Sequence, residues 1–198
     1  MEGRDYELEL PAGYESALTI DATNKKIALW LNLAALIPLI PALLLALRMI
    51  GNAGAVIPMQ KMLLFIGAML LYIVLHELVH GAAYRMLTRR KLSFGLKLTC
   101  AYCGVPDIYC YRRTALISLL APFTVFTIIF AALALFLDDT ILRAFSVVLL
   151  GMHLGGCSGD LYDTWLYLTR FRDPLTLMRD TGPAQTFYVK AEERTRKN

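Results

Sequence analysis

Four long apolar stretches dominate the pattern of hydrophobic and polar positions along the chain. They cover residues 27–47, 62–84, 115–137 and 141–167. A helix rises about 1.5 Å per residue, so about 20 mostly apolar residues are enough to cross the roughly 30 Å of hydrocarbon in a bilayer. The pattern therefore predicts an all-α membrane protein with about four transmembrane helices.

A weaker pattern, typical of β-structure, lies between the second and third apolar stretches. Residues 92–111 alternate between apolar and polar side chains, with a Gly-Val-Pro-Asp turn signal at 104–107. This alternation predicts a small β-hairpin between helices two and three. Shorter strand-like patterns at 6–10 and 186–189 predict single strands near the two ends of the chain.

The composition agrees with a membrane protein. Of the 198 residues, 57% are hydrophobic and only 18% are charged. An ordinary soluble globule and a disordered chain are both excluded, because soluble domains are less apolar and disordered chains are far more polar.

The basic residues predict the orientation in the membrane. Of the 20 Lys and Arg, 17 lie before residue 27, between 85 and 113, or after 169. Because cytoplasmic connections are enriched in Lys and Arg, we expect both termini and the long middle connection to be cytoplasmic. The chain then divides into a cytoplasmic segment at 1–26, a membrane domain at 27–169 and a cytoplasmic tail at 170–198. We expect these basic residues to face a lipid bilayer and not a nucleic acid.

The second apolar stretch contains the pattern H-E-x-x-H, at His76, Glu77 and His80. On a helix, residues four apart share a face, so both imidazoles can bind one zinc ion while the intervening glutamate acts on a metal-activated water. Ionisable side chains inside a membrane span are costly and usually functional. We therefore expect His76 and His80 to be Zn²⁺ ligands and Glu77 to be the catalytic base.

Such a site needs a third protein ligand, and Asp160 in the fourth apolar stretch is the first choice. Counted from the outer ends of their spans, His80 and Asp160 lie 18 and 19 residues inside, which places both near the cytoplasmic edge. One zinc ion would also offset the charges of Glu77 and Asp160. Asp163 and His153 on the same stretch stay open as alternatives.

The cysteines offer a possible second centre. Cys100 and Cys103 form one C-x-x-C pair, and Cys110 follows. Because no second such pair and no histidine accompany them outside the apolar stretches, we expect structural thiols and leave a metal or redox role open. Cys157 lies about one helical turn before Asp160, where we expect it to pack beside the zinc site.

Together these residues resemble the Putative zincin peptidase family, small four-pass bacterial membrane proteins. The resemblance rests on the run from His76 to Gly81, Leu-Ala-Pro-Phe at 120–123 and Gly-Asp-Leu at 159–161, and it extends over about 64–188. The chain is more distantly similar to site-2 proteases, which have Leu-Asp-Gly where this chain has Gly-Asp-Leu. The resemblance implies His76, His80 and Asp160 as ligands and Glu77 as base.

The leading hypothesis is therefore a membrane-embedded zinc metallopeptidase that hydrolyses peptide bonds of membrane or juxtamembrane proteins. A non-catalytic metal-binding membrane protein and a metal-ion transporter are the alternatives. The predicted hairpin either offers an edge strand to an extended peptide substrate or only covers the site.

Overall fold

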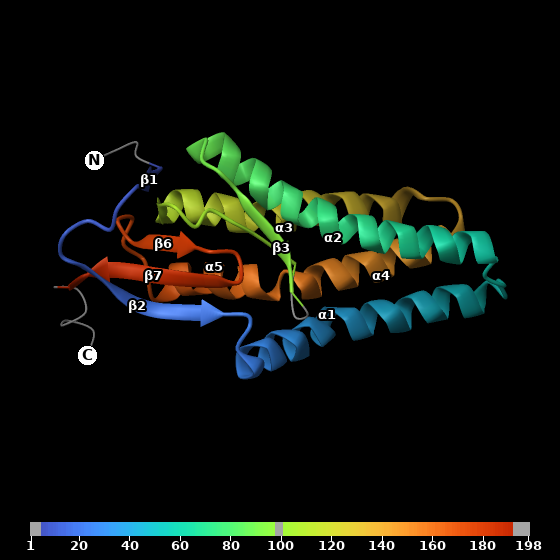
Figure 1. Cartoon of the computed structure of the whole chain (residues 1–198). Helices are drawn as coiled ribbons and strands as arrows, with labels where there is room; N and C mark the ends of the chain where they lie inside the picture. The colour runs from blue at the N-terminus through green and yellow to red at the C-terminus, as the bar shows by residue number, and fades with distance from the viewer. Residues whose placement is uncertain (1–4, 98–100, 192–198) are drawn as a thin grey trace. The chain divides into compact units, whose positions relative to one another are not determined.

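The computed structural model describes residues 5–97 and 101–191, which form five helices and seven strands (Figure 1). The helices are α1 Lys25–Asn52, α2 Met59–Thr88, α3 Arg112–Phe136, α4 Thr140–Gly156 and α5 Ser158–Thr169. The strands are β1 Tyr6–Glu7, β2 Tyr14–Asp21, β3 Ser93–Leu96, β4 Ala101–Gly104, β5 Tyr109–Tyr111, β6 Leu177–Asp180 and β7 Ala184–Lys190.

The long helices confirm the predicted fold class. Helices α1, α2 and α3 are each long and apolar enough to cross a membrane, and α4 and α5 reach that length only as a pair bent by 48°. The described chain thus has three candidate spans, or four if the bent pair is one span. Such helices are compatible with a membrane protein. The bend falls at Cys157, after Gly155 and Gly156, where low helix propensity weakens the helix.

By its internal contacts the chain separates into two compact units. The sheet unit comprises Met1–Ala28, Glu77–Ala121 and Asp160–Asn198, and the helical unit comprises Leu29–His76 and Pro122–Gly159. The boundary falls within α2, between His76 and Glu77.

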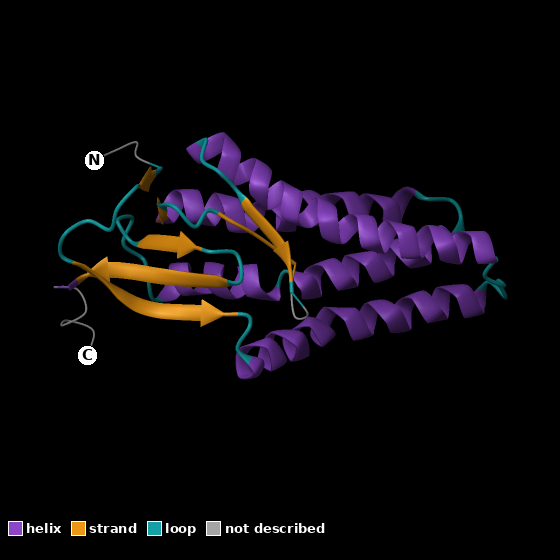
Figure 2. Ribbon diagram, in the orientation of Figure 1, coloured by secondary structure: helices purple, strands orange, loops and turns teal. Residues whose placement is uncertain are grey.

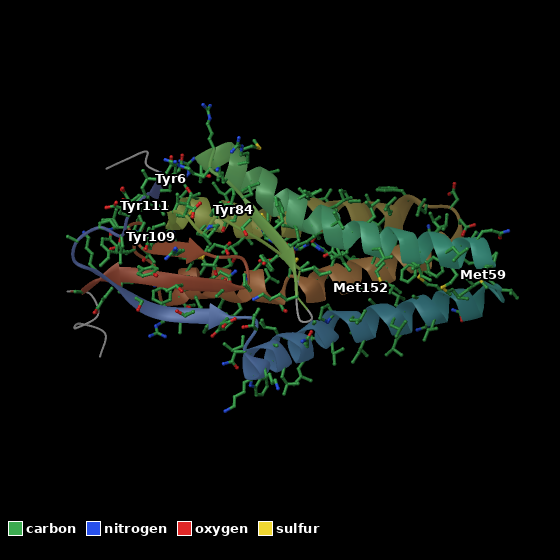
Figure 3. The ribbon with its side chains drawn as sticks, in the orientation of Figure 1. Tyr6, Met59, Tyr84, Tyr109, Tyr111 and Met152 are labelled. Atoms are coloured by element: carbon green, nitrogen blue, oxygen red, sulfur yellow. The ribbon has the colours of Figure 1, made fainter. Side chains whose placement is uncertain are left out.

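Five strands of the sheet unit form one antiparallel sheet in the order β1-β5-β6-β7-β2 (Figure 2). Its longest ladder joins β2 to β7, from Tyr14 opposite Lys190 to Asp21 opposite Ala184. At the far edge, β1 pairs with β5, where Figure 3 labels the tyrosines of both strands. Strand β7 confirms the strand predicted at 186–189, whereas β1 covers only Tyr6–Glu7 of the strand predicted at 6–10, and the sequence did not predict the whole sheet.

A buried apolar cluster holds this sheet against the helical segments of the same unit. Its members come from the sheet, the turn before β5, and helices α2, α3 and α5, and include Tyr84, Ile108, Leu119, Tyr167, Met178 and Phe187. The rings of Phe171 and Phe187 stack with centroids 4.7 Å apart. Burial of these side chains supplies the main stabilisation of the unit.

The predicted hairpin between α2 and α3 is present, with a different pairing. Ser93 to Leu96 of β3 pair with Gly104 to Ala101 of β4. The turn signal at 104–107 therefore does not close the hairpin, because β5 pairs with β1 and β6. A Cβ on Gly104 would lie 2.4 Å from the backbone nitrogen of Gly182, so only glycine permits this close approach.

Close helix packing in the helical unit depends on glycines of α4. A Cβ at Gly151 would lie 2.4 Å from the Ala42 side chain of α1, and one at Gly155 would lie 2.5 Å from the Ala35 carbonyl oxygen. Small residues permit such contacts between membrane helices. At one end of the unit, Lys61 forms an ion pair with Asp139, which also caps α4 by accepting from two backbone N–H groups.

Candidate metal centre

The H-E-x-x-H residues lie on one continuous helix, α2. His76 and His80 are buried and Glu77 is half-buried. Because α2 is unbroken from Met59 to Thr88, the two histidines stand one turn apart on the same helical face, as the spacing predicted.

Within the sheet unit, the structure brings His80 and Asp160 together. His80 Nε2 lies 3.4 Å from Asp160 Oδ2, which comes from the first turn of α5. On the other side of the ring, His80 Nδ1 lies 2.8 Å from the backbone carbonyl oxygen of Ser118 on α3. A carbonyl oxygen can only accept, so Nδ1 carries a proton, and Nε2 is the ring nitrogen that faces Asp160.

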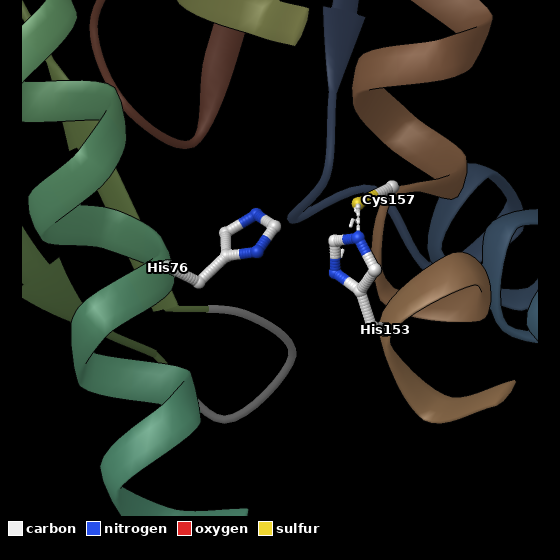
Figure 4. Close-up of side chains that lie close together, drawn as sticks. All are labelled: His76, His153 and Cys157. Atoms are coloured by element: carbon white, nitrogen blue, oxygen red, sulfur yellow. Dashed lines mark hydrogen bonds between the residues drawn. The ribbon is translucent and has the colours of Figure 1, made fainter. Parts of the chain in front are cut away.

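Within the helical unit, His76 belongs to a second buried group. The Tyr72 hydroxyl lies 3.1 Å from His76 Nδ1 and 2.9 Å from His153 Nδ1. Cys157 Sγ lies 3.6 Å from the same His153 nitrogen. Figure 4 shows His153 beside Cys157, with the side chain of His76 facing them from α2.

One backbone contact fixes the tautomer of His153. His153 Nε2 lies 3.2 Å from the Phe123 carbonyl oxygen and donates to it, so the neutral ring has its lone pair on Nδ1. The Tyr72 hydroxyl and Cys157 Sγ both lie within hydrogen-bond distance of this Nδ1.

The alternative third ligands take different places. His153 is part of the group around Tyr72 in the helical unit. Asp163 follows Asp160 by one turn of α5, in the sheet unit, and is buried. Its Oδ1 has no hydrogen-bond partner among the described residues.

Sequence reasoning gave no role to the buried pair of Tyr84 and Asp180. Tyr84, labelled in Figure 3, lies one turn beyond His80 on α2, and its hydroxyl donates to Asp180 Oδ2 over 2.7 Å. Asp180 Oδ1 accepts from the backbone N–H of Gly182 over 2.8 Å and from Gln185 Nε2 over 3.2 Å. Strand β6 reads Leu-Met-Arg-Asp, so no apolar pattern in the sequence marks Asp180 as a buried acid.

Burial raises the pKa of the Asp180 carboxyl to about 6, although the hydrogen bonds from Tyr84 and Gly182 lower it. Between the unfolded value of 3.8 and about 6, only the folded state holds the proton. The free energy of unfolding should therefore fall as the pH rises through this window and level off above it, by a total on the order of 2–3 kcal/mol.

This expectation can be measured as the thermal midpoint of the detergent-purified protein between pH 4 and pH 7. Asp180→Asn should flatten the pH dependence, whereas Asp107→Asn, at an exposed turn before β5, should leave it unchanged. Equal slopes for the parent and Asp180→Asn would show that another group titrates.

The thiols outside the long helices are poorly suited to metal binding. Cys103 and Cys110 are buried free thiols, and Cys100 lies outside the described residues. Burial raises the pKa of Cys103 to about 12 and also raises the pKa of Cys110. Among the described residues neither thiol belongs to a group of donors that could hold a metal ion, which agrees with the expected structural role.

Comparison with known proteins places the chain in a family. No curated protein and no solved structure matches it. The sequence profile of the family described as "Putative zincin peptidase" matches residues 68–173, more than half of the chain, and includes α2 from before His76 to its end, α3, α4 and α5. This match confirms the family resemblance inferred from the H-E-x-x-H and Gly-Asp-Leu motifs. The chain belongs to the Putative zincin peptidase family.

Proposed function

We propose that the protein is a membrane-embedded zinc metallopeptidase in which His76, His80 and Asp160 hold the metal and Glu77 is the general base. The distance between His80 Nε2 and Asp160 Oδ2 is the observation that supports this most directly. Two donors bound to one tetrahedral zinc ion, each about 2.0–2.1 Å from it, lie about 3.3–3.4 Å apart. The two atoms lie 3.4 Å apart.

The chemistry of the donors also fits zinc. Metal-binding histidines usually donate the proton of their other ring nitrogen to a carbonyl or carboxylate, which fixes the ring and its tautomer. His80 does so through Ser118, and the Tyr72 hydroxyl contacts Nδ1 of His76, which holds that ring in place. His76 is one helical turn from His80 on unbroken α2.

Peptide hydrolysis needs a base beside these ligands, and Glu77 has the right place on the helix. A bound zinc ion would supply Lewis-acid chemistry, activating water and polarising the substrate carbonyl. Glu77 would accept a proton from that water and return it to the leaving amine. Glu77 is half-buried and directly follows His76 on α2.

The hairpin of the sheet unit is suited to hold an extended substrate. A Cβ on Gly81, the residue after His80, would lie 2.7 Å from the Phe94 ring of β3, so the hairpin packs directly against this turn of α2. In the described chain β3 pairs only with β4, which leaves it one free edge. A membrane or juxtamembrane peptide could add to that edge through backbone hydrogen bonds.

We further propose that the protein is a multi-pass protein of the cell membrane with both termini cytoplasmic. The distribution of Lys and Arg supports this orientation, since most of them lie in the terminal segments and the connection between α2 and α3. A protease added to inverted membrane vesicles should remove a tag at either terminus. If both tags are protected in inverted vesicles and cleaved in right-side-out vesicles, the orientation is the opposite of the one proposed.

The proposed activity can be tested by removing the metal. The detergent-purified full chain should cleave some members of a fluorescently labelled set of single-span model proteins, and a zinc chelator should reduce cleavage to background because the metal is required. Added zinc should restore it, with metal content measured in parallel by mass spectrometry. Cleavage that is indifferent to chelation would overturn the proposal. So would zinc transport into proteoliposomes without any cleavage, which is the result expected of a transporter.

A further inference from the structure

We propose that His76, His153 and Cys157 form a second metal site that binds a cuprous ion. One donor atom from each residue lies within 4.8 Å of the other two, and all three side chains are buried in the helical unit (Figure 4). Neither the zincin motif nor the family match assigns a role to His153 or Cys157.

The distance between His153 and Cys157 fits donors of one ion. A metal with a sulfur ligand at about 2.3 Å and a nitrogen ligand at about 2.0–2.1 Å holds those two atoms about 3.6 Å apart. Cys157 Sγ and His153 Nδ1 are 3.6 Å apart. The Tyr72 hydroxyl lies 2.9 Å from the same nitrogen and 3.1 Å from His76 Nδ1, so it joins the two histidines of the set.

The ring of His153 is already oriented for a metal. Its Nε2 proton is donated to the Phe123 carbonyl oxygen, so Nδ1, which lies 3.6 Å from Cys157 Sγ, is the nitrogen that can bind a metal. This hydrogen bond to a carbonyl is the arrangement that fixes the tautomer of metal-binding histidines.

The donors and their surroundings favour copper(I). Thiolate and imidazole ligands together suit soft ions. The rings of Phe123, Phe126 and Phe130 surround His153 with centroids 5.9–6.1 Å away, so the site is enclosed by apolar groups. A cuprous ion with one thiolate and two neutral imidazoles has no net charge, whereas zinc would leave one positive charge in these surroundings. Binding would release the thiol proton of Cys157 to solvent.

His76 would be a ligand in both the zinc site and the copper site. The expected effect of copper on cleavage therefore rests on the proposed function. A cuprous ion bound through His76 would take one ligand from the zinc site. Cu(I) should therefore inhibit cleavage by the parent more strongly than cleavage by Cys157→Ser.

Binding itself can be measured without any cleavage assay. The detergent-purified full chain, titrated with Cu(I) against the chromophoric chelator bicinchoninate, should bind the ion, and Cys157→Ser should bind it at least about 10-fold more weakly. Cys103→Ser, which removes a buried thiol of the sheet unit, should bind Cu(I) as the parent does. His80→Ala should also retain Cu(I), because it changes only the zinc set. If Cys157→Ser does not fold, His153→Gln should show the same loss.

Equal affinity for Cu(I) in the parent and Cys157→Ser would overturn the proposed site. So would a loss of Cu(I) binding in Cys103→Ser. A parent that takes up zinc through Cys157 but no Cu(I) would overturn it as well. The two proposals can fail separately: an inactive protein whose Cu(I) binding depends on Cys157 would overturn the peptidase and support the copper site.

Discussion

Glu77→Gln should lower the rate of peptide cleavage by about 10²–10⁴-fold while the protein keeps its zinc. Glutamine has nearly the shape of glutamate, so it preserves the packing of this half-buried position on α2. It cannot accept the proton that the reaction removes from water. The variant therefore removes the proposed base and leaves the proposed zinc ligands unchanged.

The measurement combines a cleavage assay with metal analysis of the same preparations. Glu9→Gln, an exposed acid in the same unit and outside the site, makes the same chemical change and should retain full activity. A Glu77→Gln protein that cleaves as fast as the parent would exclude Glu77 as the base. Loss of activity together with loss of zinc would mean that Glu77 holds the metal, contrary to its proposed role.

The helices of this protein could be predicted from the sequence because each is marked by the hydropathy of its own residues. Long apolar runs gave α1, α2, α3 and the combined α4 and α5. The break near Cys157 lies within one such run, and hydropathy alone does not distinguish a bent helix from a straight one.

The five-stranded sheet was not predictable in the same way. Strand β5 has only three residues, and β2 joins β7 across almost the whole length of the chain. Such pairing depends on long-range contacts that leave no period in the local sequence. The prediction that the turn at 104–107 closes the hairpin was wrong for a related reason. Strand β5, which follows this turn, pairs with β1 and β6.

In the candidate site too, the local features were predictable from the sequence and the long-range contacts were not. The spacing of His76 and His80 on a helix is local, and counting residues along two spans was enough to place His80 and Asp160 at one level. Their 3.4 Å approach agrees with that count. The contacts of Tyr72 with His153 and of Tyr84 with Asp180 join residues 81 and 96 positions apart, which no local pattern reveals.

Asp160→Asn should weaken zinc binding by more than about 10–100-fold, the loss typical when only a group that orients a ligand is removed. Removal of a ligand itself should cost more, because a neutral amide is a poor donor to zinc. Asp163→Asn makes the same change one turn further along α5 and should keep zinc affinity near that of the parent. Competition with a chromophoric zinc chelator measures both affinities.

This matched pair decides the third ligand because both variants remove one carboxylate charge from the same helix of the sheet unit. A general electrostatic effect on zinc would weaken binding in both variants to a similar degree, whereas direct ligation affects one alone. The contact between Asp160 and His80 predicts that Asp160→Asn is the variant that loses zinc. Loss in Asp163→Asn with retention in Asp160→Asn would transfer the ligand role to Asp163, whose buried Oδ1 has no hydrogen-bond partner among the described residues.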